Sequence, residues 1–403
     1  MKLVIVVSEF PKLTETFAYR DAVEYERRGH DVRLFHIKRF RKGEIVHDFM
    51  RPLAARAFTF GYASPAALGA LAREAMGAPL RMIRLLLDIL RAYRADPKGG
   101  LAVIAYLPKA LALGRWCRRN GVGHIHAEFA GHPATAAMIA SRAAAVGFSF
   151  SAHAHDIFLS QALLADKARE AAFVRAISRY NMAFLAALPG FPVEKLRLVR
   201  CGVSRGTLTA NGPAPPGDGP LRILYVGALL ERKGVRHLLD ALAALPPALD
   251  WRARIIGGGD CAAALAGQAR RLGLESRVRF EGPQPAEAAA RAFRESHVAV
   301  VPSVVGERGR MEGIPVVAME AMAHGLPVIA SALSGIPELI EDRVTGRLAP
   351  PGDAAAIAAA LVDIWSDWPA AAAMGARGRE RIADTYIVED NAGALLRLME
   401  EAA

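Results

Sequence analysis

The ten residues Asn211–Pro220 divide the chain into two halves that follow the same pattern. They include four prolines and three glycines, so they support neither a helix nor a central strand, and we predict a linker. On both sides, short apolar runs alternate with stretches of helical period, which is typical of α/β folds with parallel sheets. Since 403 residues fit two such domains, we expect them at 1–207 and 221–380, joined by the linker at 208–220.

The apolar runs predict six strands in each half, with helices between most of them. The strands are expected at 3–7, 32–37, 125–127, 148–152, 174–177 and 196–200, and then at 221–226, 253–256, 278–281, 298–301, 328–330 and 347–348. Helices in the second half are expected at 234–245, 260–272, 285–295, 315–324, 353–366 and 390–402. Ligands of open α/β sheets bind beyond the carboxyl ends of the strands, so both domains are expected to face a central cleft.

Composition narrows the class of ligand. The net charge of +11 fits nucleic acid, an anionic membrane or phosphorylated substrates. The arginines are not interleaved with aromatic residues and no nucleic-acid motif appears, so we exclude nucleic acid. Cys117, Cys201 and Cys261 have neither disulfide nor zinc spacing, and the first apolar run is too short for a signal peptide. We therefore expect a cytoplasmic protein of a reducing compartment.

The segment from Glu312 to Glu320 predicts an anion site with two carboxylates beside it. Gly313 and Pro315 are typical of a loop that turns into a helix, with Pro315 as the first helical residue, and a helix N-terminus attracts anions. Glu320 would lie inside the helix among apolar residues, where a carboxylate is costly unless a partner such as a ligand hydroxyl satisfies it. The combination suits a sugar attached to a phosphate.

A basic loop follows the first strand of the second half. Gly227 permits a tight exit from the strand, and Arg232 and Lys233 stand at the entrance of the next helix, before Gly234. Cations there oppose the helix dipole, but a bound diphosphate would reverse that sign. The alternative is a solvated basic loop.

Two further turns in this half are rich in small residues. Around Gly258, three glycines follow a strand, and Asp260 is the expected N-cap of the next helix. Ser334 and Gly335 follow another strand, and the backbone N–H groups of that turn suit phosphate or sugar contact. The alternative for the turn around Gly258 is a plain tight turn. The alternative for the turn at Ser334 and Gly335 is a capped helix start.

In the first half, His153 and Asp156 come at the end of a strand. His153 would point into the cleft, where it donates to a sugar hydroxyl or titrates near neutral pH. His155 and Asp156 would orient it or cap the next helix. Two histidines and an aspartate also suggest a metal, but no third cluster has suitable spacing, so we expect none.

The loop after the first strand contains Lys12, Thr14 and Glu15. Thr14 is the expected N-cap of a helix that runs to Arg28. The loop would face the cleft opposite the second domain, where an acceptor would bind. The alternative is a loop that only caps the helix.

Residues 80–94 have the pattern of a basic amphipathic helix. Four arginines share one face with Asp88 while the rest is strongly apolar, and more cations follow. These cations are Arg81, Arg84, Arg91, Arg94, Lys109, Arg115, Arg118 and Arg119. Because such a helix binds anionic lipid, we predict contact with a membrane surface; the alternative is a core-packed helix with a solvated face.

Together these motifs resemble family 4 glycosyltransferases of the GT-B fold. The resemblance covers nearly the whole chain, and its most specific part is the pair of glutamates followed by Ala-Met-Ala-His-Gly-Leu-Pro. The other motifs are residues 227–234, 335–338 and 153–156. The first half is similar to bacterial exopolysaccharide glycosyltransferases of the colanic-acid type, in residues 8–17, 28–32, 124–127, 132–135 and 152–158.

The resemblance implies two Rossmann-like domains around a cleft, with a final helix at 381–403 returning to the first. It also implies retaining transfer from a UDP- or GDP-sugar, without metal or cofactor. Lys233 and Arg232 would neutralise the diphosphate, Glu312 would bind the sugar and Glu320 the ribose. His153 would touch the sugar near the reacting carbon. The other expected donor-binding residues are Gly227, Gly258, Gly313, Ile314, Ser334 and Gly335, and those on the acceptor side are Lys12, Thr14, Glu15 and Asp156.

The implied acceptor is a lipid-linked glycan, such as one carried on polyprenyl diphosphate, in exopolysaccharide synthesis at the inner face of the membrane. A soluble acceptor, as in sucrose or trehalose synthases, and a non-catalytic nucleotide-sugar-binding protein are the alternatives. Two positions depart from the family pattern. Ala228 stands where arginine is frequent, with Arg232 as the candidate replacement, and Ser204 stands where aspartate is frequent.

Overall fold

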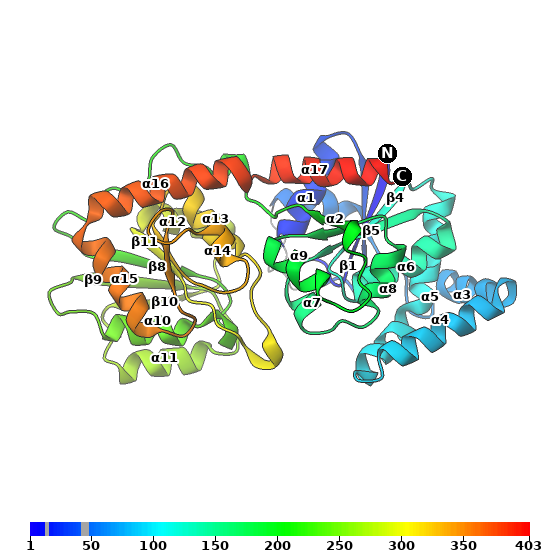
Figure 1. The fold of residues 1–403 in the computed structure, drawn as a ribbon, viewed down its shortest axis with the longest axis horizontal. Coiled ribbons are helices and arrows are strands. Elements are labelled where there is room, and N and C mark those ends of the chain that lie inside the picture. The colour runs from blue at the N-terminus through cyan, green and yellow to red at the C-terminus, as the bar shows by residue number, and fades with distance from the viewer. Residues whose placement is uncertain (13–15, 42–47) are drawn as a thin grey trace. The chain divides into compact units, whose positions relative to one another are not determined.

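The structure is a computed structural model that describes residues 1–12, 16–41 and 48–403. Its internal contacts divide the chain into two compact units (Figure 1). The N-terminal unit comprises Met1–Val199 and Glu389–Ala403, and the C-terminal unit comprises Arg200–Val388. Each unit is built around one parallel β-sheet, which confirms the predicted pair of Rossmann-like α/β domains.

The sheet of the N-terminal unit has seven parallel strands in the order β3-β2-β1-β4-β5-β6-β7. They are β1 (Lys2–Val7), β2 (Asp31–His36), β3 (Ala57–Phe58), β4 (His124–Glu128), β5 (Gly147–Ala152), β6 (Val174–Ala176) and β7 (Leu196–Leu198). The central strands β1, β4 and β5 are buried along nearly their whole length, as expected of a parallel sheet with helices on both faces.

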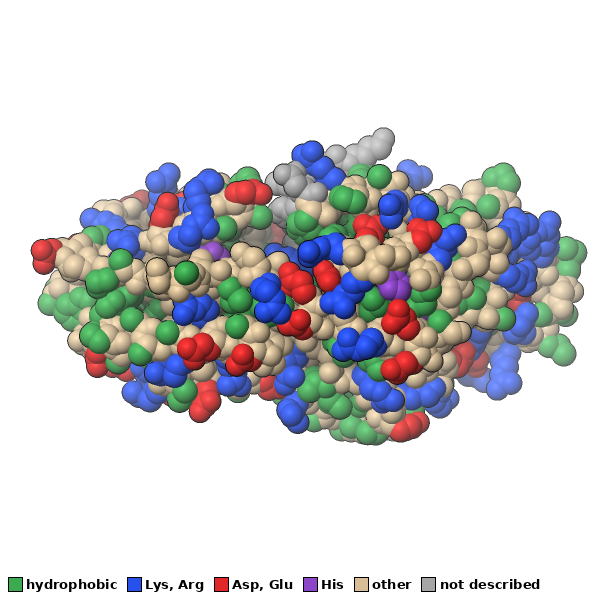
Figure 2. Space-filling model, turned by 90° about the horizontal axis from the view of Figure 1, so that it is seen from above, with side chains coloured by type: hydrophobic (Ala, Val, Ile, Leu, Met, Phe, Trp, Pro, Cys, Tyr) green, Lys and Arg blue, Asp and Glu red, His purple; other side chains and the backbone are tan. Residues whose placement is uncertain are grey.

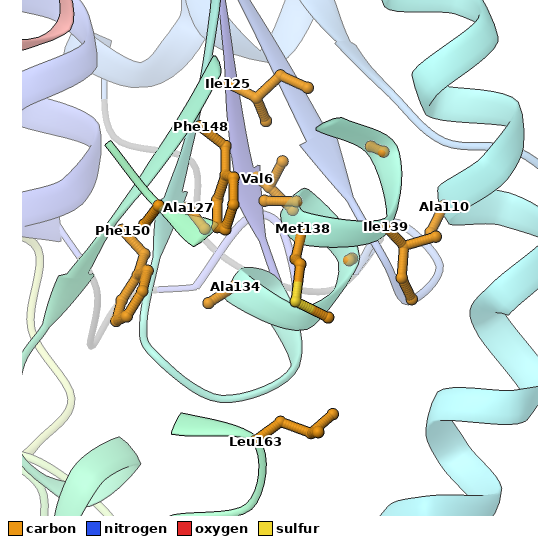
Figure 3. Packing of buried hydrophobic residues seen from close by; sticks show 14 of the residues in the cluster. Val6, Ala110, Ile125, Ala127, Ala134, Met138, Ile139, Phe148, Phe150 and Leu163 are labelled. Atoms are coloured by element: carbon orange, nitrogen blue, oxygen red, sulfur yellow. The ribbon is translucent and has the colours of Figure 1, made fainter. Parts of the chain in front are cut away.

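The two faces of this sheet have separate apolar cores. On one face, Ile125 of β4 and Phe148 and Phe150 of β5 pack with Met138 of α6 (His132–Ala144), beneath the long helix α5 (Pro97–Arg119) (Figure 3). The other face is covered by α1 (Thr16–Arg27) and the last helix, α17 (Val388–Glu401).

The last helix completes the core of the N-terminal unit. Leu395 and Met399 of α17 are fully buried in one cluster with Leu3 and Ile5 of β1. These two pairs lie about 390 residues apart in the sequence, so the first and last segments of the chain form one hydrophobic face.

Smaller helices complete the N-terminal unit. They are α2 (Arg51–Arg56), α3 (Pro65–Gly77), α4 (Pro79–Ala92), α7 (His155–Phe158), α8 (Leu164–Glu170) and α9 (Arg179–Ala186). Of these, α3 and α4 pack against α5 and form an outer helical layer (Figure 1).

The C-terminal unit has six parallel strands in the order β10-β9-β8-β11-β12-β13. They are β8 (Leu221–Val226), β9 (Trp251–Ile256), β10 (Val278–Gly282), β11 (Val298–Val301), β12 (Val328–Ser331) and β13 (Arg347–Ala349). The helices are α10 (Val235–Ala243), α11 (Ala262–Arg271), α12 (Ala286–Glu295), α13 (Val316–Ala323), α14 (Ile336–Leu339), α15 (Ala354–Ser366) and α16 (Trp368–Thr385).

The structure contains every predicted strand, with ends that either agree with the prediction or differ from it by one or two residues. The strand β3 was not predicted because two residues carry no readable period. Helix α16 was also missed, since Gly375 and Gly378 lower its helix propensity.

Two predicted helix starts are wrong. Asp260 is not the N-cap of α11, because Cys261 takes that position and its N–H donates to the Leu229 carbonyl at 3.0 Å. The turn before α11 therefore packs on the loop after β8, and the helix begins later in the sequence than predicted. Pro315 is the N-cap of α13 and not its first helical residue.

Candidate functional site

Two cations converge on one carboxylate in the C-terminal unit. The Nζ of Lys233 donates to Oε2 of Glu312 at 2.9 Å, and the Nε of Arg232 donates to Oε1 of the same residue at 3.2 Å. Both cations lie in the short 3-10 helix Glu231–Lys233, which joins β8 to α10. The fold thus brings together the basic loop and the glutamate segment, which lie 79 residues apart in the sequence.

The electrostatics of this cluster favour charged side chains. Burial alone would raise the pKa of Glu312, but the charges and hydrogen bonds of Lys233 and Arg232 together lower it. The cations remain reachable from solvent, since the side chain of Arg232 is 32% exposed and that of Lys233 is 16% exposed. An anionic ligand can therefore compete with Glu312 for both.

Glycine backbones pack the loop after β8, which leads to the two cations, against the loop after β9, and we call this contact the glycine floor. Gly257 has φ of +141°, and a Cβ there would lie 1.8 Å from the carbonyl oxygen of Gly227. The loops after β8 and β9 therefore pack backbone against backbone, and the N–H of Leu229 donates to the Gly258 carbonyl at 2.8 Å. Two of the predicted donor-binding residues, Gly227 and Gly258, lie in this floor.

Tyr225 supports the same loop and was missed by sequence reasoning. Its hydroxyl donates to the carbonyl oxygen of Ala228 at 2.9 Å. Burial raises its pKa, and the nearby charge of Glu312 adds to that effect. It therefore stays a neutral donor that fixes the loop. Tyrosine in an apolar strand resembles an ordinary core residue, so the sequence carried no signal for this role.

Ser334 holds the glutamate segment in place. Its hydroxyl lies within hydrogen-bonding distance of the backbone carbonyls of Glu312 and Gly313, at 2.9 Å from the latter. Gly313 and Ile314 are buried where the chain enters α13, and Gly335 follows directly at the N-cap of α14. Ser334 thus joins the turn before α14 to the backbone of Glu312 and Gly313, and Ile314 and Gly335 are the chain neighbours of these bonded residues.

Glu320, the second glutamate of the pair, lies in the second turn of α13. It is partly buried, between the buried Met319 and Ala321. Its backbone carbonyl accepts from the ring of His324 at 2.8 Å. Its place inside the helix is as predicted, while the apolar surroundings of its carboxylate and its contact with a ribose stay predictions.

In the N-terminal unit, His153 follows β5 and is almost fully buried. Its Nε2 lies 2.9 Å from Oε2 of Glu128, at the end of β4. The ring is held between Phe17 and Phe129, with centroid distances of 4.6 and 4.7 Å. Sequence reasoning missed Glu128, although its strand, His-Ile-His-Ala-Glu, alternates polar with apolar residues as a sheet-buried polar row would.

Asp156, which we expected on the acceptor side, is a backbone acceptor in the structure. Its carboxylate accepts from the N–H of Ala130 at 2.7 Å, of Ala154 at 2.8 Å and of His153 at 3.1 Å. It therefore ties the loop after β4 to the loop after β5. The bond from the His153 N–H fits the expected role of Asp156 in orienting His153, and direct contact with an acceptor stays a prediction.

The other acceptor-side residues lie in or near the loop after β1. Lys12 is partly exposed and lies close to Glu9, whose pKa is lowered mainly by a hydrogen bond from Lys38, with further effects of Lys12 and Arg41. Thr14 and Glu15 lie outside the described residues. The acceptor-side assignment of this loop remains a prediction.

The predicted basic helix is α4, and its exposed face is not purely basic. The arginines at 81, 84, 91 and 94 are exposed, but apolar side chains are exposed among them. These are Leu80, Ile83, Leu87 and Leu90, with exposed fractions of 81%, 53%, 44% and 59%. Met82, Leu85 and Ile89 face inward. We call the exposed set the α4 stripe.

Lys109 does not belong to this surface, contrary to expectation. It is 1% exposed, and its ammonium donates to the backbone carbonyl of Ile37. Arg115, Arg118 and Arg119 do lie together: the pKa of Arg115 is lowered by burial and then by repulsion from Arg73, Arg119 and Arg118. Figure 2 shows basic side chains beside hydrophobic ones at the right-hand end, where Figure 1 places α3, α4 and α5.

The described residues show neither a helix that could cross a membrane nor a cluster of metal-binding side chains. None of the helices there has the length and apolar character needed to cross a bilayer. In residues 1–12, 16–41 and 48–403, His, Cys, Asp and Glu side chains do not gather in threes as a metal ion would require. The independence from metal stays a prediction.

Comparison with known proteins places this geometry in context. The family model described as glycosyl transferases group 1 matches residues 220–367. Over 298 residues, the chain is 30% identical to the GDP-mannose-dependent alpha-(1-6)-phosphatidylinositol monomannoside mannosyltransferase of Mycolicibacterium smegmatis, covering 70% of this chain and 78% of that protein. Over 189 residues it is 41% identical to an amylovoran biosynthesis glycosyltransferase of Erwinia amylovora, covering 46% of each.

The coverage and the structural likeness set the scope of these matches. The chain spans about half the length of the curated relatives named for amylovoran and colanic acid biosynthesis. Among solved structures, the Anabaena protein HepE in complex with UDP is similar over 99% of both chains, with a TM-score of 0.75 and 19% identity. At that identity the likeness shows the fold.

Proposed function

The chain belongs to the group 1 glycosyltransferases, family 4 of the GT-B fold, and we propose that it transfers a sugar from a nucleotide-diphosphate sugar to a glycan acceptor. The observation that carries the proposal is the convergence of Lys233 and Arg232 on Glu312. Two solvent-reachable cations beside a glycine floor and the N-terminus of α13 make a seat for a diphosphate.

The proposed donor occupies this seat with its diphosphate against the two cations. Glu312, once released from part of its ion pairing, accepts from hydroxyls of the sugar, and Glu320 accepts from those of the ribose. The Anabaena structure named for its UDP complex and the mannosyltransferase named for GDP-mannose support a nucleotide donor of one of these two kinds.

In the proposed reaction, the bond between the reacting sugar carbon and the diphosphate oxygen breaks, and an acceptor hydroxyl forms the new bond on the same face. The acceptor's proton goes to the departing phosphate oxygen. Negative charge builds on that oxygen, and Lys233 and Arg232 stabilise it without a metal ion. His153 is proposed to contact the donor sugar near the reacting carbon.

Arg232 is proposed to replace the arginine that the family often has at position 228. Ala228 brings no charge, and its backbone carbonyl is held by Tyr225. Arg232 supplies a guanidinium to the same carboxylate that Lys233 contacts. Two cations therefore lie beside Glu312 even though residue 228 is neutral.

A screen of donors by thermal unfolding tests this proposal. At a donor concentration of about 100 times Kd, binding stabilises the native state by about 2.7 kcal/mol. We expect a rise in Tm of about 5–10 °C for UDP- or GDP-sugars, and a smaller rise for the free sugars. Equal Tm values with both nucleotide classes and with buffer would overturn the proposed donor.

We further propose that the acceptor is lipid-linked and that the α4 stripe docks the protein on an anionic membrane surface. A soluble protein rarely exposes several large apolar side chains in one row. Here Leu80, Ile83, Leu87 and Leu90 lie among exposed arginines, so apolar insertion and attraction to anionic headgroups act together. We also propose a place at the inner face of the membrane in exopolysaccharide synthesis, which the relatives named for amylovoran and colanic acid biosynthesis support.

Vesicle sedimentation tests the membrane proposal. The variant with Leu80→Ser and Leu87→Ser should bind phosphatidylglycerol-containing vesicles at least about tenfold more weakly than the unchanged protein, because each leucine contributes about 1.5 kcal/mol or more when buried. Leu272→Ser, which removes one exposed leucine at the C-cap of α11 in the other unit, is the control and should bind as the unchanged protein does. Unchanged vesicle binding by the double variant would contradict the membrane proposal and favour a soluble acceptor. A dimer of the unchanged protein that is lost in the double variant would also contradict it, because the α4 stripe would then bind a second copy of the chain.

A further inference from the structure

A row of buried polar side chains crosses the α1-covered face of the N-terminal sheet. Leu3 and Ile5 of β1 pair with His124 and His126 of β4, so these histidines share the face of Leu3 and Ile5, which lies under α1 and α17. We define the polar row as Asp21 of α1, His124, His126 and Glu128 of β4, Ser149 and Ser151 of β5, His153, and Arg175 of β6. Each of these residues is at least 90% buried.

The polar row is continuous from its deep end to His153. Ser149 Oγ lies 2.8 Å from Nε2 of His124 and 2.7 Å from Nδ1 of His126. The Nε2 of His126 lies 2.9 Å from Ser151 Oγ and 3.6 Å from Oε1 of Glu128. Glu128 then meets His153 through its other oxygen. Such a network is costly to bury unless every member is satisfied.

Arg175 joins the two carboxylates of the row. Its Nη1 lies 2.6 Å from Oδ2 of Asp21 and 3.9 Å from Oε1 of Glu128, and its Nε donates to the carbonyl of Val199 at 2.9 Å. Asp21 lies 154 residues away from Arg175 in the sequence. The guanidinium is fully buried, and its Nη1 faces both carboxylates of the row.

The inner histidines do not supply positive charge near neutral pH. Burial lowers the pKa of His124 to about 3 and that of His126 to about 4. Burial raises the pKa of Asp21 to about 6 despite Arg175. For Glu128, burial is outweighed by the hydrogen bond with His153 and by the charges around it, which hold its pKa near the bottom of the carboxyl range.

The charges of the row therefore balance only if His153 is protonated. Among the described members of the row, Asp21 and Glu128 are negative at neutral pH and Arg175 is positive, so these three side chains together carry one negative charge. A buried unpaired charge is strongly unfavourable. Since His124 and His126 are neutral, the ring that can supply the missing positive charge is that of His153, which touches Glu128 directly.

We propose that Glu128 is a positioning residue for His153, which fixes its ring and keeps it as an imidazolium in the resting enzyme. This rests on the proposed function, in which His153 contacts the donor sugar. The protonated ring has an N–H at Nδ1 as well as at Nε2, so it acts toward a sugar oxygen as a charged hydrogen-bond donor. Phe17 and Phe129 hold the imidazolium between their rings, which favours the cation.

Nitrogen NMR of the protein labelled at its 11 histidines tests the charge state without any activity. His153→Gln identifies the signal by its loss. We expect imidazolium shifts for His153 at about pH 7.5, and neutral shifts for His124 and His126. In Glu128→Gln the ring should be neutral at that pH, because its pKa falls by more than about one unit, a tenfold change in proton affinity. A neutral His153 ring in the unchanged protein would overturn the proposal.

Kinetics separate positioning from a structural role. Glu128→Gln should lower kcat about 10- to 100-fold, the range typical when a partner that orients a functional side chain is lost, with little change in the KM for the donor. Glu128→Asp keeps the charge and should recover part of kcat. Ser149→Ala, which removes contacts of His124 and His126 but none of His153, should keep kcat even if it lowers Tm.

The outcomes distinguish this inference from the proposed function. If no nucleotide sugar supports transfer by the unchanged protein, the proposed function fails while the NMR result still decides the charge of His153. If Glu128→Gln and Ser149→Ala lower kcat equally, or if Glu128→Gln leaves the His153 titration unchanged, Glu128 is a structural residue and the inference is wrong.

Discussion

Lys233→Ala is expected to lower the rate of sugar transfer by about 10²–10³-fold, which corresponds to about 2.7–4 kcal/mol of transition-state stabilisation. Lys233 donates to Glu312 from a site that is still reachable by solvent. As the nucleoside diphosphate departs, its charge grows, and a fixed ammonium is then worth more than in the ground state. We therefore expect the substitution to act mainly on kcat and less on KM. The rate is measured with the donor that gives the largest rise in Tm.

Arg236→Ala is the matched control for this experiment. Arg236 lies on the first turn of α10, three residues after Lys233, and is exposed. Its removal changes the net charge by the same amount, so a general electrostatic effect would lower both rates. Transfer at the unchanged rate by Lys233→Ala, with Tm values alike for all three proteins, would show that the diphosphate is stabilised elsewhere.

Gly234→Ala is expected to destabilise the C-terminal unit by about 3 kcal/mol or more, within the range of severe single substitutions. Gly234 has φ of +66°, and a Cβ there would lie 1.8 Å from the carbonyl oxygen of Pro302. The loop after β11 must then move, and its Val304 N–H loses its bond to the carbonyl of Arg232 at 2.8 Å. The substitution therefore destabilises the fold and also displaces the adjacent cations. Calorimetry of the unfolding transition measures the first effect.

Gly217→Ala separates the backbone penalty from the clash. Gly217 has φ of +56°, and the structure describes no atom within 4 Å of a Cβ placed there. This substitution costs only the left-handed conformation, about 1–2 kcal/mol. Equal destabilisation by Gly234→Ala and Gly217→Ala would mean that the loop moves the Pro302 carbonyl away from the new Cβ at no cost in free energy.

The elements of the fold could be predicted because most strands are apolar runs between turn residues. β8 and β11 have their predicted bounds for that reason. The failures have equally local causes. The start of α11 depends on a hydrogen bond from Cys261 to Leu229 across two loops, and such a contact between distant segments leaves no periodic signal in the sequence.

The candidate site could be predicted in its parts but not in its connections. The sequence predicts Lys233 and Glu312 as donor-binding residues because each stands at a turn before a helix. Their direct ion pair became visible only in the structure. For Glu128, the strand sequence was noticed only as a family motif, and its electrostatic role depends on Asp21 and Arg175, which come from other parts of the fold.

The position of α17 has a consequence for how the protein is made. The C-terminal unit is one uninterrupted stretch of chain, whereas the N-terminal unit needs its last 15 residues, Glu389–Ala403, from the other side of that insertion. During translation, the second unit can fold as soon as it emerges, since domains generally fold as they are synthesised. The apolar face of β1, with Leu3 and Ile5, stays uncovered until Leu395 and Met399 have been synthesised. The apolar face of β1 is therefore covered only after the whole C-terminal unit has been synthesised, and an apolar surface exposed for that time is prone to aggregation.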